Sequence, residues 1–103
     1  MLIPALAGGL AATQPEKSAV QTGEAIYRQK CGGCHGLDGK AESTMGKTWK
    51  MRDLTSTKVQ NQTDQELLSV IANGRGHMPA YEMILGNDKI RDVIAYIREI
   101  GKK

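Results

Sequence analysis

The stretch that most constrains this chain is Cys31-Gly-Gly-Cys34-His35, because it holds both cysteines and one of the two histidines of the sequence. Two thiols separated by two residues and followed at once by an imidazole can serve a redox dithiol, a zinc site or a covalent haem anchor. These sites differ in what else the chain must supply. The remaining sequence therefore decides which chemistry the motif serves.

The surroundings of the motif favour one of the three sites. A thioredoxin-like dithiol belongs at the start of a helix in a βαβ unit, but no strand pattern precedes Cys31. A structural zinc site needs four ligands, and beyond the motif the chain offers only His77 and distant carboxylates. In c-type haem attachment, by contrast, two thiols at this spacing can reach both vinyl groups on one edge of a porphyrin, and the next imidazole lies beneath the ring. We therefore interpret Cys31 and Cys34 as haem attachment residues and His35 as an iron ligand.

A second iron ligand is expected in the stretch Gly-Arg-Gly-His-Met-Pro-Ala-Tyr, residues 74–81. Methionine opposite histidine is the pairing that raises the potential of a haem used for electron transfer. Met78 lies 43 positions after His35, which is enough chain to pass round to the far face of a porphyrin. Pro79 stiffens this loop. His77 is a stronger nitrogen donor, but adjacent residues cannot normally face the same point, and we favour Met78. The other methionines in question are interpreted as core fillers: Met45, Met51 and Met83.

The composition fits one domain of 103 residues with an unusual core. The chain has no Phe, one Trp and three Tyr, so a bound apolar cofactor would supply buried area that aromatic rings usually give. The net charge of +3 is spread among acidic residues, and no aromatic residues stand beside basic runs. We therefore expect no nucleic-acid binding.

Three stretches have helical spacing of apolar residues: one from Thr22 into the cysteines, one over residues 63–74 and one over residues 87–101. Thr63 and Glu66 predict a capping box, and Gly74 is placed to end that helix with a positive φ. Asn87 or Asp88 is expected to cap the last helix. Residues 36–61 read as loop with a short helical turn. The sequence thus predicts an all-α domain with three main helices and long loops, which usually wrap something functional.

Residues 1–21 are expected to be a leader or linker, and residues 22–103 the folded domain. The first twelve residues are apolar but too short to span a bilayer, and they lack the basic start of a complete secretion signal. A signal remnant and an unstructured leader are both consistent with this stretch.

With both motifs in place, the chain resembles the class I c-type cytochromes, small all-α bacterial monohaem proteins, over most of residues 22–101. The resemblance implies a cytochrome c-like fold wrapped around one haem c, bound covalently through Cys31 and Cys34. It implies His35 and Met78 as the axial ligands of the iron. It also implies that the first helix, at Gly23 and Tyr27, crosses the last helix near Val93 and Tyr96.

The function implied by the resemblance is single-electron transfer rather than catalysis. It implies a periplasmic protein and redox partner proteins as donor and acceptor, such as a reductase or oxidase complex. Membrane contact is expected only if the N-terminal leader is retained. The alternative from a different class is a haem module that binds or senses a gas, which requires an open or weak sixth position. A small peroxidase would also need a distal base, and His77 is the only histidine left for that role.

One feature departs from the family pattern. Many relatives have a proline shortly after the proximal histidine, whose carbonyl orients the imidazole, but this chain has none between His35 and Pro79. We expect a backbone carbonyl between Met45 and Lys50 to take that role. Candidate hydrogen-bond donors to the haem propionates are the side chains of Trp49, Arg52 and Thr55.

Covalent attachment predicts a mass signature. When the protein is made in a host equipped for cytochrome maturation, its mass should exceed the polypeptide mass by one haem, and the excess should persist after denaturation. Mass spectrometry of native and denatured protein measures this. A colourless product with two free sulfhydryl groups would contradict the interpretation of the cysteine motif.

Overall fold

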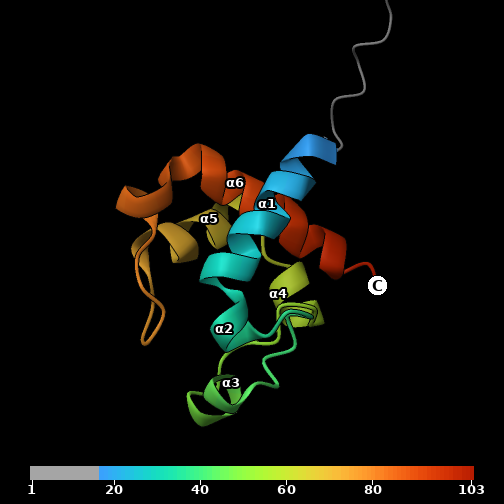
Figure 1. Cartoon of the computed structure of the whole chain (residues 1–103), viewed down its shortest axis with the longest axis vertical. Helices are drawn as coiled ribbons and strands as arrows, with labels where there is room; N and C mark the ends of the chain where they lie inside the picture. The colour runs from blue at the N-terminus through green and yellow to red at the C-terminus, as the bar shows by residue number, and fades with distance from the viewer. Residues whose placement is uncertain (1–16) are drawn as a thin grey trace, which may run out of the picture.

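The computed structural model describes residues 17–103, which form helices and no β-strand. The all-α prediction is confirmed. The elements in chain order are α1 (Lys17–Lys30), α2 (Gly32–His35), α3 (Thr44–Thr48), α4 (Thr57–Gln60), α5 (Asp64–Asn73) and α6 (Glu82–Ile100). Figure 1 shows their arrangement, with α2 and α3 beyond the end of α1. None of these helices has both the length and the apolar character of a membrane span.

The first helix starts earlier than the sequence suggested. It spans residues from Lys17 on rather than from Thr22, so the expected start at Thr22 is wrong, and Thr22 lies inside the helix instead of capping it. Residues 17–22 contain neither Gly nor Pro, and Val20 packs against the core, which favours helix over linker. Of the expected leader or linker, residues 17–21 belong to this helix, and residues 1–16 lie outside the described part of the chain.

The capping predicted for the second main helix is confirmed. Thr63 Oγ1 accepts a hydrogen bond from the Glu66 backbone N–H at 3.0 Å, and Glu66 Oε1 accepts one from the Thr63 N–H at 2.8 Å. This capping box satisfies two N–H groups that the helix itself leaves unpaired. Gly74 ends α5 with a φ of 78°.

The third main helix begins one turn earlier than predicted. Residues 82–85 form a first turn, and Gly86, with φ 79° and ψ 159°, interrupts the helix directly before the expected caps at Asn87 and Asp88. The region expected to be loop contains two short helices, α3 and α4. Ser43 and Ser56 cap them, each accepting a hydrogen bond from a backbone N–H of the first turn.

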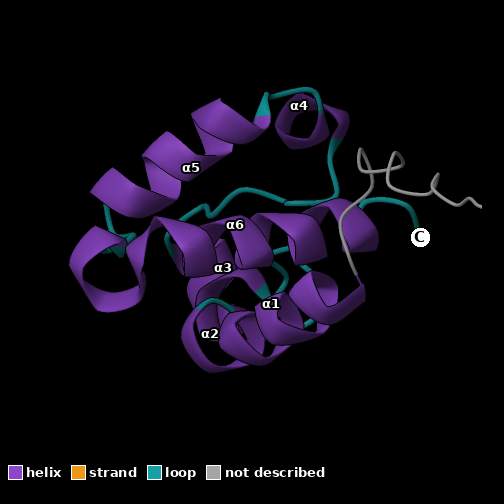
Figure 2. Cartoon of the chain, turned by 90° about the horizontal axis from the view of Figure 1, so that it is seen from above, coloured by secondary structure: helices purple, strands orange, loops and turns teal. Residues whose placement is uncertain are grey.

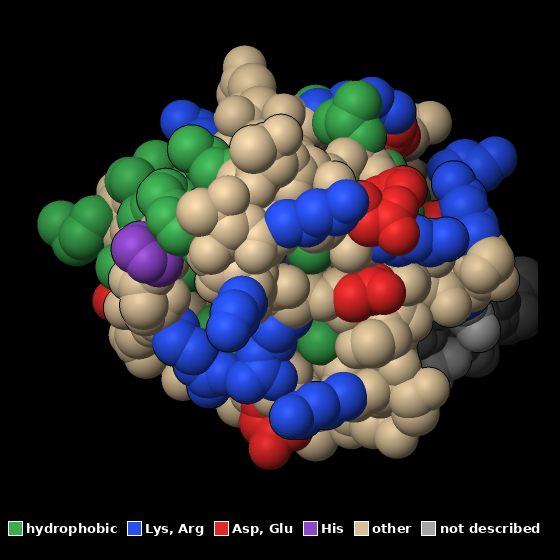
Figure 3. All heavy atoms as spheres, turned by 90° about the horizontal axis from the view of Figure 1, so that it is seen from below, with side chains coloured by type: hydrophobic (Ala, Val, Ile, Leu, Met, Phe, Trp, Pro, Cys, Tyr) green, Lys and Arg blue, Asp and Glu red, His purple; other side chains and the backbone are tan. Residues whose placement is uncertain are grey.

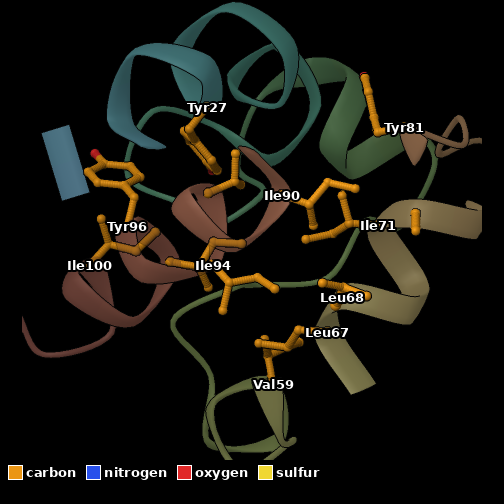
Figure 4. Close-up of a cluster of buried hydrophobic side chains, with 13 residues drawn as sticks. Tyr27, Val59, Leu67, Leu68, Ile71, Tyr81, Ile90, Ile94, Tyr96 and Ile100 are labelled. Atoms are coloured by element: carbon orange, nitrogen blue, oxygen red, sulfur yellow. The ribbon is translucent and has the colours of Figure 1, made fainter. Parts of the chain in front are cut away.

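The core lies where α6 packs between α5 and α1, as Figure 2 shows. Tyr27, Ile90 and Val93 are completely buried. Figure 4 shows the apolar side chains of α5 and α6 facing one another, with Tyr27 on the α1 side. The buried cluster comprises Tyr27, Val59, Leu67, Leu68, Ile71, Ala72, Tyr81, Ile90, Val93, Ile94, Tyr96, Ile97 and Ile100.

The predicted crossing of α1 and α6 is confirmed. A Cβ on Gly23 would overlap the backbone carbonyl of Asp92, so only glycine allows the two backbones to lie this close. One turn further along α1, the rings of Tyr27 and Tyr96 pack with centroids 5.3 Å apart and planes tilted by 55°. The crossing therefore joins the N-terminal and C-terminal helices through both backbone and ring contacts.

Replacing Gly23 by Ala should destabilise the folded protein by roughly 3 kcal/mol, the upper end of the usual cost of overpacking, because backbone rather than a flexible side chain is in the way. Guanidinium unfolding followed by circular dichroism measures the change. Gly33→Ala is the matched control, because a Cβ there meets nothing within 4 Å; we expect it to change stability by less than about 1 kcal/mol in either direction. Equal stability of the two variants would contradict the close approach of α1 and α6.

Candidate functional site

A cavity of about 270 Å³ lies between the three main helices and the loops that connect them. Its walls include Tyr27 of α1, Ile71 of α5, and Val93 and Ile97 of α6. Residues 49–52 and 75–78 also line it, together with Leu54, Val59 and Gln62. A smaller hollow of about 30 Å³ is lined partly by the same residues, namely Cys31, His35, Met51, His77 and Met78.

The fold brings the predicted site residues to these two hollows. Five of the eight predicted residues line the larger cavity: Cys31, His35, Trp49, Arg52 and Met78. Cys34 and Pro79 line the smaller hollow. Thr55 is not among the lining residues of either hollow, and its hydroxyl instead donates to Asp53 Oδ1 at 2.6 Å. The chain segments around residues 31–35, 49–52 and 78–79 thus meet at one place, although their individual roles stay predictions.

His35 ends the short helix α2 and is only 7% exposed. Its Nδ1 lies 3.1 Å from the backbone carbonyl oxygen of Arg52. Because a carbonyl can only accept, Nδ1 carries the proton, and the lone pair of the neutral ring is on Nε2. Burial lowers the pKa of His35 below its ordinary value, and the hydrogen bond to Arg52 opposes that shift only in part. His35 is therefore held as the neutral tautomer that a metal requires.

The carbonyl that orients His35 is not where we expected it. We expected a carbonyl between Met45 and Lys50, and this is wrong, because the carbonyl belongs to Arg52. After α3 the chain turns back on itself: Lys50 has a φ of 53°, and the N–H of Met51 donates to the carbonyl of Gly46 at 2.8 Å. This turn takes up residues 49–51 and delivers the next carbonyl to the imidazole.

The two cysteines lie on either side of the start of α2. Cys31 occupies the N-cap position, and burial, helped by the neighbouring Cys34, raises the pKa of its thiol to about 11. A redox dithiol depends on a lowered thiol pKa, because the thiolate is the nucleophile. The environment of Cys31 therefore argues against the thioredoxin-like alternative. Cys34 is half-buried, and its sulfur lies 3.6 Å from the sulfur of Met45.

Ser43 fastens α3 to the cysteine motif. Its hydroxyl accepts a hydrogen bond from the N–H of Gly46 at 3.0 Å and donates to the carbonyl of Cys34 at 2.9 Å. A single side chain therefore caps one helix and satisfies a carbonyl at the C-terminal end of another. Sequence reasoning did not identify Ser43, although a serine directly before a helical turn is a recognisable capping signal.

Met78 approaches the cavity from a tight turn after α5. The backbones of Arg75 and Met78 exchange two hydrogen bonds, of 3.0 and 2.8 Å, and Gly76 in the turn has a φ of 57°. Met78 is half-buried against the core. The backbone at Met78 is thus held by the hydrogen-bonded turn before it and by Pro79 after it.

Two side chains that the sequence analysis passed over also line the cavity, Lys50 and Arg75. With Arg52 they place three cations around it, and none of the three forms an ion pair within residues 17–103. Figure 3 shows Lys and Arg side chains gathered on one face of the molecule, next to a group of hydrophobic side chains and a histidine. In the sequence, the only indication that Lys50 and Arg75 belong to the site is that they stand next to Trp49 and just before the His77-Met78 pair, respectively. Unpaired cations at the edge of an apolar cavity suit a ligand that carries carboxylates.

His77 contacts a side chain from a different loop. Its ring stacks on that of Trp49, with centroids 4.2 Å apart and planes within 7° of parallel. Trp49 is 37% exposed, His77 is exposed, and both line the cavity. The stack joins two segments that are far apart in the sequence, which no periodicity could have indicated.

The chain is similar in sequence to several known proteins. A family model described as "Cytochrome C oxidase, cbb3-type, subunit III" matches residues 18–97. The chain is 31% identical over 81 residues to a cytochrome c6-like protein of Nostoc sp., covering 79% of this chain and 70% of that protein. It is 33% identical over 82 residues to cytochrome c6 of Gloeothece citriformis, covering 79% and 71%.

Two further matches are of other kinds, one to part of a longer protein and one to a solved structure. The chain is 25% identical over 99 residues to the cbb3-type cytochrome c oxidase subunit FixPc of Rhizobium leguminosarum, covering 96% of this chain but only 34% of that subunit. Among solved structures, the KustC0563 c-type cytochrome superposes with a TM-score of 0.69 at 22% identity, covering 76% of this chain and 95% of that one. The structural similarity supports the fold.

Removing the Ser43 hydroxyl should cost more than removing an ordinary cap. We expect Ser43→Ala to lower the free energy of unfolding by about 2 kcal/mol, since it loses a cap worth about 1 kcal/mol and leaves the Cys34 carbonyl without its donor. Ser56→Ala, which caps α4, is the matched control and should cost about 1 kcal/mol. Chemical denaturation of the two holoproteins compares them, and an equal loss would speak against the link between Ser43 and the cysteine motif.

Proposed function

Because the chain belongs to the class I c-type cytochromes, which carry a covalently bound haem, we propose that it is a single-electron carrier with His35 and Met78 as axial ligands. The observation that carries this proposal is the apolar cavity at whose walls Cys31, His35 and Met78 meet. Two thiols, an imidazole and a thioether are the donor set that a c-type haem with His/Met ligation uses. The residues present therefore suit the group.

Cys31 and Cys34 are proposed as the two attachment residues. They are the only cysteines in the sequence; Cys31 lines both hollows, and Cys34 lines the smaller one. Their backbone is fixed: the N–H of His35 donates to the carbonyl of Cys31 at 3.0 Å, and Ser43 holds the carbonyl of Cys34. Fixed thiols define the position and tilt of whatever is bound to them.

His35 and Met78 are proposed as the two side chains that would bind the iron of the haem. His35 keeps its Nε2 lone pair free because Nδ1–H donates to Arg52, and this hydrogen bond also prevents rotation of the ring. Met78 comes from a separate segment of the chain, on a turn that its own backbone closes. The haem supplies an iron that exchanges one electron between the ferrous and ferric states. Ligands held in place in both states keep the reorganisation that accompanies transfer small.

Charge and polarity around the cavity fit the carboxylates that a haem carries. We propose that the Trp49 indole N–H and the Arg52 guanidinium donate to the propionates, since both line the cavity. Lys50 and Arg75 add positive charge at the same place. Pro79 is proposed to stiffen the chain next to Met78.

The protein is proposed to work in the periplasm, passing electrons between a donor and an acceptor protein. A cbb3-type oxidase complex is the acceptor that the comparisons suggest, because the matching family model and FixPc both bear the names of oxidase subunits. The net charge of +3 favours an acidic docking surface on the partner, with binding that weakens as salt increases. Contact with a membrane is expected only through a retained N-terminal leader.

Replacing Met78 by Ala tests the axial assignment. We expect the ferric absorption band typical of iron–sulfur ligation to disappear, the reduction potential to fall, and the iron to bind carbon monoxide or imidazole readily, because the sixth position is open. Absorption spectroscopy of the ferric and ferrous holoprotein measures this. Met51→Ala is the control, because Met51 lines the same two hollows and should leave the band unchanged.

Two outcomes would overturn the proposal. A ferric band that survives Met78→Ala means that another residue is the distal ligand. A high-spin spectrum of the unaltered protein means that the sixth position is open, as a gas-binding module or a peroxidase requires.

A further inference from the structure

We infer that Trp49 and His77 form a clamp that holds the Met78 loop closed over the haem cavity, which makes both of them positioning residues for the distal ligand. This inference rests on the proposed function, because it takes Met78 to be that ligand. The observation behind it is the stack between the two rings, with centroids 4.2 Å apart and planes within 7° of parallel. We call this pair the Trp49–His77 clamp.

On the distal side, the clamp grips the turn that carries Met78. His77 lies between Arg75 and Met78, whose backbones exchange two hydrogen bonds. The turn must therefore move as a unit, and Met78 cannot swing away from the cavity without carrying its neighbour His77 along. Such a movement separates the two stacked rings.

On the opposite side, the clamp is tied to the proximal wall. At the end of α3, the backbone N–H of Trp49 donates to the carbonyl of Met45 at 3.0 Å. The other end of α3 is fastened to the Cys34 carbonyl by Ser43. Three residues after Trp49, the carbonyl of Arg52 holds the ring of His35. Trp49 thus belongs to the segment that fixes the cysteines and the proximal histidine.

The clamp accordingly couples the two sides of the site. Met78 and its turn lie on a surface loop, and such loops open locally at a free energy well below that of global unfolding. A stacked aromatic pair that must break during opening adds to that cost. We expect loss of the stack to make dissociation of Met78 about three- to tenfold faster, which is the range that an aromatic pair of ordinary strength gives. Trp49 is 37% exposed, so the stack is screened in part by water and a much larger effect is not expected.

The binding of imidazole to the ferric holoprotein measures this opening, because imidazole can reach the iron only after Met78 has left. The rate at saturating imidazole, followed by stopped-flow absorption, reports dissociation of the loop ligand. We expect Trp49→Ala and His77→Ala to raise this rate about three- to tenfold each. The double variant should be no faster than either single variant, because each change alone already removes the whole stack.

Two further variants separate the clamp from other roles. His77→Phe keeps a ring in the stack and should restore a rate close to that of the unaltered protein. Met83→Ala removes an exposed hydrophobic side chain five residues after Met78 and should leave the rate unchanged, since Met83 is 95% exposed and belongs to neither hollow. If Trp49 acts only through a haem propionate, Trp49→Ala changes the rate while His77→Ala does not, and the clamp is refuted.

The test also distinguishes the clamp from the ligand assignment beneath it. The ferric band of iron–sulfur ligation in the unaltered protein reports whether a methionine is bound at all. If that band is present, depends on Met78, and both alanine variants still bind imidazole at the unaltered rate, the clamp is wrong while the proposed function stands. If the band is absent, the distal assignment fails first and the clamp fails with it.

Discussion

The helices α1 and α6 cross with their backbones in contact at Gly23, and the position of the haem cavity follows from this crossing. Beyond the contact, Tyr27 packs on Tyr96, and its hydroxyl donates to the carbonyl of Gly36 at 2.7 Å, just past the cysteine motif. Tyr27 therefore ties the end of α1 to the chain that leaves His35. On the α6 side, Val93 lies at the crossing and also lines the cavity. The close backbone approach thus sets the distance between the wall of the cavity and the thiols at its edge.

The segment from Ser43 to Arg52 connects the two halves of the site. Ser43 holds the Cys34 carbonyl, Arg52 holds the imidazole of His35, and Trp49 stacks on His77 next to Met78. Ser43 and Trp49 lie at the two ends of the short helix α3, and Arg52 lies in the turn after it. The cysteine motif, the imidazole of His35 and the loop that carries Met78 are therefore all contacted by the same short segment of the chain.

The low aromatic content of the chain agrees with a large apolar cavity in its core. A chain with no Phe and one Trp surrounds a space of about 270 Å³ with Leu, Ile and Val from α5 and α6, so a haem occupying that space becomes part of the hydrophobic core. The chain is similar in sequence to proteins of different lengths. The chain covers most of the length of the cytochrome c6 proteins it matches but about a third of FixPc. The domain is therefore a unit that is found both as most of a small protein and as one part of a longer one.

The helical class, the capping box of Thr63 and Glu66 and the cysteine motif could be predicted from residues close together in the chain, or from a spacing that one helix imposes. The helix crossing at Gly23 was expected only from the family resemblance. Three contacts could be seen only once the chain was folded: Arg52, not a residue between Met45 and Lys50, orients His35, Thr55 donates to Asp53, and Trp49 stacks on His77. Those contacts depend on the path of an irregular loop, where a single residue with positive φ such as Lys50 redirects every carbonyl and side chain after it. Local sequence patterns indicate which stretches of the chain form helices. Which loops then contact each other depends on how the helices pack, because packing decides which distant segments come together.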